Sequence, residues 1–249
     1  RRHIAERHRD FATHGGIRIR GHFRGHREHL MIGTTQRPIR DKTLRGVFGL
    51  QQGFDLRDAF IAEVLREEGV DGLRKIASHV ATLRRLTAMA KVPALAEWIA
   101  DFVWAGERAG NSGEKLVVFA HHRDVIRSLN AYVNEHSAWG VVVIDGDTEP
   151  HRRQEAVDRF QNDPLCRVFI GQLQAAGTGL TLTAASTVLL AEQSWVPAEN
   201  VQAAARVHRI GQKNACQVWS AVLAGSIDEQ VGAALTRKMN DLVQLFGSV

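Results

Sequence analysis

The chain has 249 residues, 44% of them hydrophobic and 24% charged, which is the composition of an ordinary globular protein. No apolar run approaches the roughly 20 residues that a membrane span needs, and the opening "RRHIAERHRD" lacks the apolar core of a signal peptide. Two cysteines, Cys166 and Cys216, do not make a disulfide framework, so we expect a reducing, intracellular setting. Since no apolar run is long enough to span a membrane, we expect no membrane partner. Because the sequence begins at Arg1 and not at a methionine, a fragment or a processed piece of a longer protein is one interpretation, which stays open.

Positive charge is concentrated at the start of the chain. Residues 1–45 contain twelve Lys and Arg but four Asp and Glu, whereas the remainder contains 20 basic and 23 acidic residues. A basic arm on a mildly acidic body is a common layout in proteins that bind nucleic acid. A solvated basic segment without a partner explains the same charge, and both interpretations stay open.

Residues 1–55 show no sustained hydrophobic periodicity and are interrupted by glycines, so we expect a basic, irregular segment. His22, His26 and His29 recur at helical spacing and are a conceivable zinc site. The intervening glycines weaken that helix and no cysteine lies nearby, so we predict no metal site here.

Residues 56–110 are predicted to form a helical connector. The runs "LRDAFIAEVLREEG" and "LRKIASHVATLRRLTAMA" place apolar residues at three- and four-residue intervals. Pro93 is expected to open a further helix at its first turn, because proline is tolerated there. No catalytic pattern is visible in this region.

From residue 111 to 249, short apolar runs alternate with helical segments. Strands are predicted in "LVVFA", "GVVVID", "CRVFIG", "STVLLAE" and "ACQVWSAVLA", and helices at about 124–134, 149–161, 198–209 and 227–246. Strands without polar alternation, joined by helices, predict an α/β fold with an open parallel sheet that helices cover on both faces.

Unusual residues follow the predicted strands, at the edge where ligands meet an open parallel sheet. The loop "QLQAAGTGLTLT" contains Gly177, Thr178 and Gly179, whose backbone amides could approach an anion; a plain tight turn is the alternative. The chain contains neither the Walker phosphate loop G-x-x-x-x-G-K-[ST] nor the dinucleotide fingerprint G-x-G-x-x-G.

The segment "QAAARVHRIGQ" carries Arg206 and Arg209 three residues apart. This spacing predicts that both guanidinium groups lie on one face of a helix, about one turn apart. Such a pair is either a solvated surface turn or a pair of groups directed at a phosphate.

Four blocks in order, "EKLVVFAHHRDV", "VIDGDTEPHRRQEAVDRFQ", "QAAGTGLTLTAASTVLLAEQSWVPAENVQAAARVHRIGQ" and "SIDEQV", resemble the second RecA-like lobe of superfamily-two helicases. The resemblance is closest to the Swi/Snf-like DNA translocases and, within them, to the fork-remodelling annealing helicases. It covers about residues 83–247 and implies a RecA-like fold for residues 111–249.

The resemblance also implies roles for individual residues. Arg206 and Arg209 correspond to the family's arginine fingers, which act on ATP and Mg²⁺ held mainly by a first, Walker-containing lobe. The positions that line the nucleotide are Gly177, Thr178, Gly179, Gln202, His208 and Gln212. The positions that contact DNA through its backbone are His121, His122, Arg123, Gly146, Arg153, Gln174, Thr181 and Trp195, although Trp195 could instead pack in the core.

The predicted function is therefore that of the second motor lobe of an ATP-dependent translocase on duplex or forked DNA. The first lobe is expected in cis or in trans, and this chain alone is expected not to hydrolyse ATP. The alternative is a lobe-only DNA-binding or regulatory module that never turns over ATP.

Overall fold

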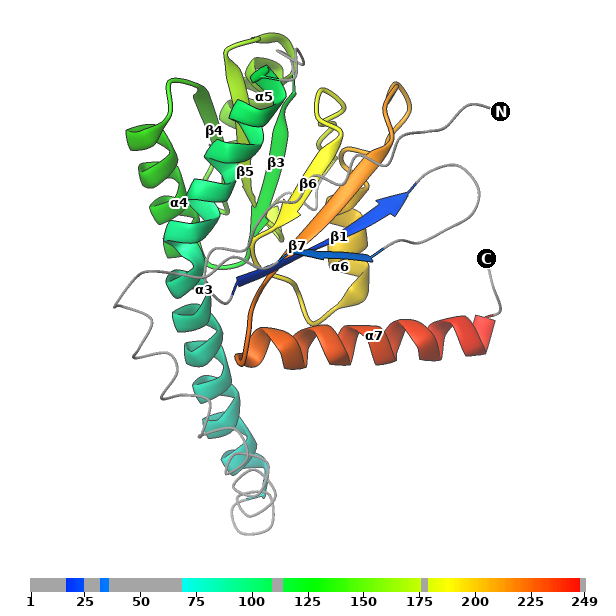
Figure 1. The fold of residues 1–249 in the computed structure, drawn as a ribbon. Coiled ribbons are helices and arrows are strands. Elements are labelled where there is room, and N and C mark those ends of the chain that lie inside the picture. Colours follow the sequence, from blue (N-terminus) through cyan, green and yellow to red (C-terminus); the bar gives the residue numbers. More distant parts are fainter. Residues whose placement is uncertain (1–16, 25–31, 36–68, 109–113, 176–178, 247–249) are drawn as a thin grey trace.

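The computed structural model describes residues 17–24, 32–35, 69–108, 114–175 and 179–246. In these residues, one sheet has the strand order β2-β1-β7-β6-β3-β5-β4 (Figure 1). The strands are β1 (Ile17–Arg24), β2 (Ile32–Thr35), β3 (Leu116–Ala120), β4 (Gly140–Ile144), β5 (Cys166–Gln172), β6 (Thr187–Leu190) and β7 (Cys216–Leu223). The helices are α3 (Gly69–Arg108), α4 (Arg123–His136), α5 (Pro150–Asn162), α6 (Pro197–Ala204) and α7 (Ile227–Phe246).

The five strands β7, β6, β3, β5 and β4 are parallel to one another, so the predicted RecA-like α/β sheet is confirmed. At its β7 edge the sheet is extended by β1, which pairs antiparallel with β7, and by β2, which pairs antiparallel with β1. Both added strands fall in residues 1–55, where we expected an irregular segment, so that expectation is wrong for 17–24 and 32–35. The division of the chain into three domains stays a prediction.

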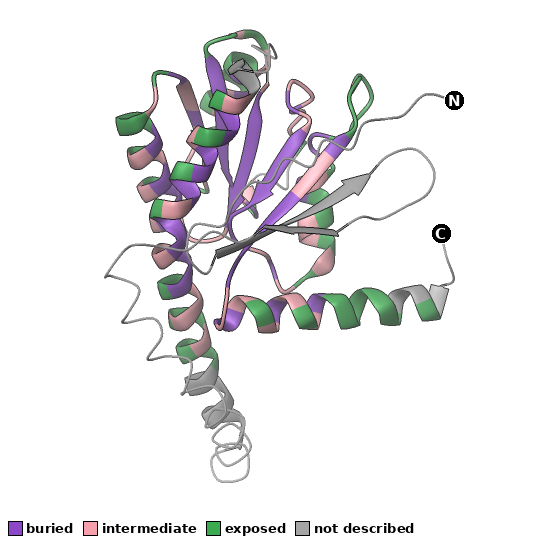
Figure 2. Cartoon of the chain, viewed as in Figure 1, coloured by how far each residue is buried: buried purple, intermediate pink, exposed green. Residues whose placement is uncertain are grey.

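Helices cover both faces of the parallel strands, as the sequence predicted (Figure 1). On β3, Leu116 and Val118 belong to the core shared with α3 and α4, whereas Val117 and Phe119 belong to the core shared with α5 and α6. All five residues of β3 are fully buried, as the central strand in Figure 2 shows. Burial on both faces explains why this strand reads as a continuous apolar run.

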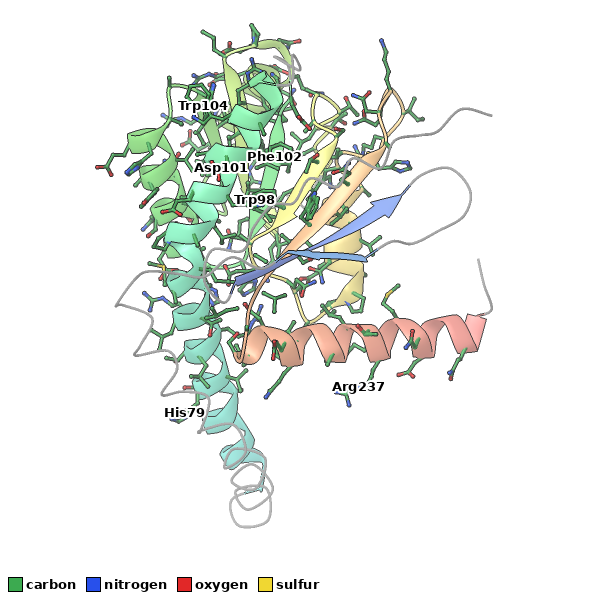
Figure 3. The ribbon with its side chains drawn as sticks, viewed as in Figure 1. His79, Trp98, Asp101, Phe102, Trp104 and Arg237 are labelled. Atoms are coloured by element: carbon green, nitrogen blue, oxygen red, sulfur yellow. The ribbon has the colours of Figure 1, made fainter. Side chains whose placement is uncertain are left out.

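The helix α3 is continuous through Pro93, which corrects the expectation that this proline opens a separate helix. Pro93 is exposed, whereas its neighbours Val92 and Leu95 are buried against the sheet. Burial of this apolar face outweighs the lost backbone hydrogen bond of the proline. Further along α3, the Trp98 ring stacks on Phe102 with 5.4 Å between centroids (Figure 3).

The closing helix α7 begins with a small apolar cluster of its own. Ile227, Val231 and Leu235 pack together against Val80 and Leu83 of α3. Beyond Leu235 the side chains of α7 that the structure describes are exposed up to residue 241 (Figure 2). The first turns of α7 therefore attach it to α3.

Candidate nucleic-acid and phosphate interface

The loops that follow the parallel strands lie at one edge of the sheet. Register pairs Ala120 at the end of β3 with Gln172 at the end of β5, and Phe119 with Leu190 at the end of β6. Because these strands end side by side, the polar residues after each of them come together, as expected for a ligand-binding edge.

The loop after β3 forms an elbow at the start of α4, and Glu192 holds it. Glu192 Oε2 accepts hydrogen bonds from the backbone N–H groups of His121 and His122, both at 2.9 Å, and Oε1 lies 2.6 Å from His122 Nδ1. Glu192 is 4% exposed. Burial raises its pKa, but the hydrogen bonds from the His122 side chain and backbone, together with the positive charge of Lys91, outweigh burial and hold the pKa below the ordinary value.

His121 is half-buried, and burial, followed by the positive charge of Arg84, lowers its pKa. The His121 imidazole is therefore neutral at pH 7 and could meet a phosphate through a hydrogen bond rather than through an ion pair. Arg123 lies next in the chain and pairs with Asp147, with Asp145 Oδ2 at 3.8 Å from its Nε. Its charge is therefore balanced by carboxylates of the loop after β4 in this structure.

Arg153 connects the loop after β4 to the loop after β5 through hydrogen bonds. Its guanidinium donates to the carbonyl oxygen of Thr148 at 2.7 Å, and longer contacts reach the carbonyl oxygens of Asp145 and Ala175. Gly146 donates its backbone N–H to Gln172 Oε1 at 2.9 Å. These contacts join the loop after β4 to the loop after β5.

The loop after β5 is described in part. Gly177 and Thr178 lie outside the described residues, and Gln174 is exposed. Gly179 has φ +68°, a left-handed backbone that favours glycine. The Arg209 guanidinium donates from Nη1 to the Gly179 carbonyl oxygen at 3.2 Å and to Thr181 Oγ1 at 3.1 Å.

The arginine pair lies on a turn and not on the predicted helix 198–209. Helix α6 ends at Ala204, and residues 205–212 form successive turns. Gly211, with φ +100°, ends this run in the left-handed region. The expectation that Arg206 and Arg209 share one face of a helix is therefore wrong.

The two arginines differ in exposure. Arg206 is 8% exposed, whereas Arg209 is exposed at the tip of the turn together with His208. Burial, followed by the positive charge of Arg209, lowers the pKa of Arg206, so the two positive charges disfavour each other. An anion such as a nucleotide phosphate fits a pair of this kind, since it would offset the repulsion.

Gln212 holds this turn in place. Its Nε2 lies within hydrogen-bond distance of the carbonyl oxygens of Thr183, Ala185 and Val207, the shortest at 2.6 Å, and its Oε1 accepts from the Asn214 N–H. Its amide is directed into the protein, whereas Gln202 is exposed on α6.

Trp195 is partly buried and packs against the apolar cluster at the start of α7. The Arg84 guanidinium lies 5.7 Å from the centroid of its ring, and Lys238 Nζ donates to its carbonyl oxygen at 2.8 Å. These contacts support the alternative that Trp195 packs in the core and does not contact DNA.

Sequence reasoning missed three polar residues that organise this edge: Glu192, Gln172 and Lys91. Lys91 is fully buried on α3, and its Nζ contacts the carbonyl oxygens of Ala191 and Ala221 and the Asp228 carboxylate at 2.8 Å. The sequence did carry a signal for Lys91, which is a lysine inside the apolar stripe of α3. Because an unpaired buried charge is costly, such a lysine indicates a buried polar partner.

No group of three or more His, Cys, Asp or Glu side chains able to hold a metal ion occurs in the described part of the chain. Of the histidines weighed as zinc ligands, His26 and His29 lie outside it. The helices described are too short or too polar to cross a membrane.

Comparison with known proteins identifies the domain. Residues 92–211 match the family model of the helicase conserved C-terminal domain. These residues are a helicase C-terminal domain of the Swi/Snf-like type.

Among the relatives, the DNA annealing helicase and endonuclease ZRANB3 of Mus musculus is 33% identical over 195 residues, 74% of this chain and 18% of the relative. The SWI/SNF-related matrix-associated actin-dependent regulator of chromatin subfamily A-like protein 1 homolog of Caenorhabditis elegans is 33% identical over 72% of this chain and 25% of that protein. The chain thus spans a quarter or less of the length of these relatives.

A solved structure, the C-terminal part of the Fun30 ATPase domain, is similar with a TM-score of 0.52 and 26% identity, over 58% of this chain and 44% of that one. The comparisons confirm the resemblance to Swi/Snf-like helicases and the RecA-like fold.

Proposed function

We propose that this chain is the second motor lobe of an ATP-dependent translocase on double-stranded DNA. The observation that carries the proposal is the arginine pair on the turn after α6, in which a buried Arg206 is followed three residues later by an exposed Arg209. Guanidinium groups held in advance near a phosphoryl group stabilise the charge that develops during its transfer. ATP with Mg²⁺ would be held mainly by a Walker-containing lobe, and Arg206 and Arg209 would approach its phosphates from this chain.

The contacts of Arg209 suggest how the nucleotide and DNA sites communicate. Its guanidinium bonds Gly179 and Thr181, in the loop that the family resemblance assigns to both sites. A shift of Arg209 toward a phosphate would release or redirect these bonds and so move the loop. Gly177, Thr178, Gln202 and His208 remain proposed neighbours of the nucleotide, whereas Gln212 is proposed to act by holding the turn.

DNA would lie along the carboxyl edge of the sheet. Side-chain and backbone donors in this region suit phosphate oxygens, which position a duplex without reading its sequence. The proposed contacts are His121, His122, Arg123, Gly146, Arg153, Gln174, Thr181 and Trp195. Arg123 would have to exchange its carboxylate partners for phosphate, which predicts contact that weakens steeply with salt.

The first lobe is proposed to be joined in cis or supplied in trans, inside the cell, and this chain by itself would not turn over ATP. Closure of the two lobes around ATP would then advance them along duplex or forked DNA. Because this chain would supply only one side of the ATP-binding cleft, it would bind DNA without completing the cycle of ATP hydrolysis.

The test is DNA-stimulated ATP hydrolysis by this chain joined to the Walker-containing lobe of a Swi/Snf-like relative. Arg209→Ala is expected to lower the rate by about 10³-fold, since a finger contributes roughly that much, while leaving DNA affinity near its original value. Arg127→Ala is the matched control and should leave the rate unchanged, because Arg127 is exposed on α4, which packs on the face of the sheet opposite to that covered by α6.

Two results would contradict the proposal. An active joined protein whose Arg209→Ala variant hydrolyses ATP at the unaltered rate would exclude the finger role. DNA binding by the lone chain, with no active pairing to any Walker-containing lobe, would favour the lobe-only DNA-binding module instead.

A further inference from the structure

Both polar groups of the His121 backbone are held by side chains from neighbouring strands. Its N–H donates to Glu192, which follows β6, at 2.9 Å, and its carbonyl oxygen accepts from Gln172 Nε2, at the end of β5, at 3.2 Å. Glu192 also accepts the N–H of His122 and contacts its ring. Side chains from two neighbouring strands therefore hold the elbow between β3 and α4. We call these hydrogen bonds of Glu192 and Gln172 the grip.

Gln172 extends this grip to a third loop. Its Nε2 bonds His121, and its Oε1 accepts the N–H of Gly146 in the loop after β4. A single amide side chain thus sets the spacing between the elbow and the next loop along the edge. A Cβ at Gly146 would lie 3.3 Å from this oxygen, so the approach is close.

The position of Glu192 suits the start of α4. His122 is the N-cap of α4, and its side chain makes no capping hydrogen bond. Glu192 carries a buried carboxylate just ahead of the helix, where the helix dipole favours negative charge. Next to it, Lys91 Nζ bonds the carbonyl oxygen of Ala191.

We propose that Glu192 and Gln172 are positioning residues that hold His121 and His122 in the geometry for contact with the DNA backbone. The inference rests on the proposed function. Neither residue needs to touch DNA, because each acts through the elbow that it holds.

This role makes a prediction opposite to that of simple electrostatics. Glu192→Gln removes a negative charge from a DNA-facing edge, so charge alone predicts tighter binding. Loss of the grip predicts weaker binding. Without these hydrogen bonds the elbow backbone is less ordered before binding, so part of the binding free energy is used to order it. Fixing the backbone of one residue has a free-energy cost equivalent to about tenfold in affinity.

The experiment uses the full 249-residue chain and a fluorescein-labelled 30-base-pair duplex, with the dissociation constant measured by anisotropy. Glu192→Gln and Gln172→Ala are each expected to weaken binding by about tenfold. Glu135→Gln, at the far end of α4, makes the same charge change, and Gln244→Ala on α7 removes the same amide; both residues are exposed, and both variants should bind as the unaltered chain does.

Amide hydrogen exchange supplies a second readout that does not depend on DNA. Glu192→Gln should speed exchange at His121 and His122, and Gln172→Ala should speed it at Gly146, with the strand amides unaffected. Since glutamine has the shape of glutamate, Glu192→Gln still carries the test if Gln172→Ala does not fold.

Unchanged or tighter DNA binding by Glu192→Gln would overturn the positioning role, and unchanged exchange at the elbow would overturn the grip. Absence of DNA binding by the unaltered chain would contradict the proposed function, and the DNA role of the grip with it. The exchange measurement separates these failures, because it reports on the elbow alone.

Discussion

Arg209 donates a hydrogen bond from Nη1 to the Gly179 carbonyl oxygen at 3.2 Å, although 30 positions separate the two residues in the chain. The same nitrogen bonds Thr181 Oγ1. Two hydrogen bonds therefore join the turn after α6 to residues 179–181, which follow β5. This contact connects the proposed nucleotide face to the proposed DNA face.

Thr181→Val tests this connection. The substitution keeps the shape of the side chain but removes the oxygen that accepts from Arg209. A hydrogen bond to a charged group contributes about 1.5–3 kcal/mol, so we expect DNA-stimulated ATP hydrolysis by the joined protein to fall by about 10- to 100-fold. Hydrolysis without DNA should change less, and Thr236→Val on the exposed face of α7 is the control. Equal loss of both rates would show that Thr181 does not couple the two sites.

Lys91→Met is expected to destabilise the fold strongly. Removing Lys91 leaves the Asp228 carboxylate and the carbonyl oxygens of Ala191 and Ala221 without their shared partner. Breaking a buried pair by deleting one member costs about 3–5 kcal/mol, measured here as the free energy of unfolding in urea. The double variant with Asp228→Asn should lose less than the sum of the two single variants, and an additive result would contradict the coupling.

Two glycines make a matched pair for a packing test. A Cβ on Gly171 would lie 2.8 Å from Phe169 Cε1 and 3.0 Å from Phe119 Cε1, whereas a Cβ on Gly232 of α7 would meet nothing within 4 Å. Gly171→Ala should lower the free energy of unfolding by about 1–3 kcal/mol through overpacking. Gly232→Ala should raise it by about 0.5–1 kcal/mol, because alanine is the better helix former. Loss of stability in both variants would contradict this account.

The stability that Glu192 contributes depends on pH. Burial raises its pKa, but the His122 hydrogen bonds outweigh burial, so the folded pKa lies below the ordinary value of 4.5. A depressed carboxyl pKa stabilises the fold above about pH 4.5, and this stabilisation is lost as pH falls through the folded pKa. The difference in unfolding free energy between the unaltered chain and Glu192→Gln should therefore be constant near neutral pH and shrink below pH 4.5. A difference that instead grows as the pH falls below 4.5 would contradict this account.

The local pattern of the sequence predicted the elements of the lobe closely. The apolar run Leu116–Ala120 is a strand with those bounds, and the helix 227–246 spans those residues. Both follow from short-range rules, because a strand buried on both faces is apolar throughout and an amphipathic helix repeats every three to four residues. The order of four motif blocks then identified the Swi/Snf-like helicase lobe, which the comparisons confirm.

Tertiary structure decided what local rules could not. Pro93 continues a helix because the residues around it are buried against the sheet. Helix α6 ends at Ala204, and Gln212 ties the turn that follows to carbonyl oxygens more than twenty residues away. Glu192 meets the elbow at His121 across 71 positions of chain. Hydrogen bonds between such distant partners depend on how the strands pair, so no periodicity or propensity in the sequence encodes them.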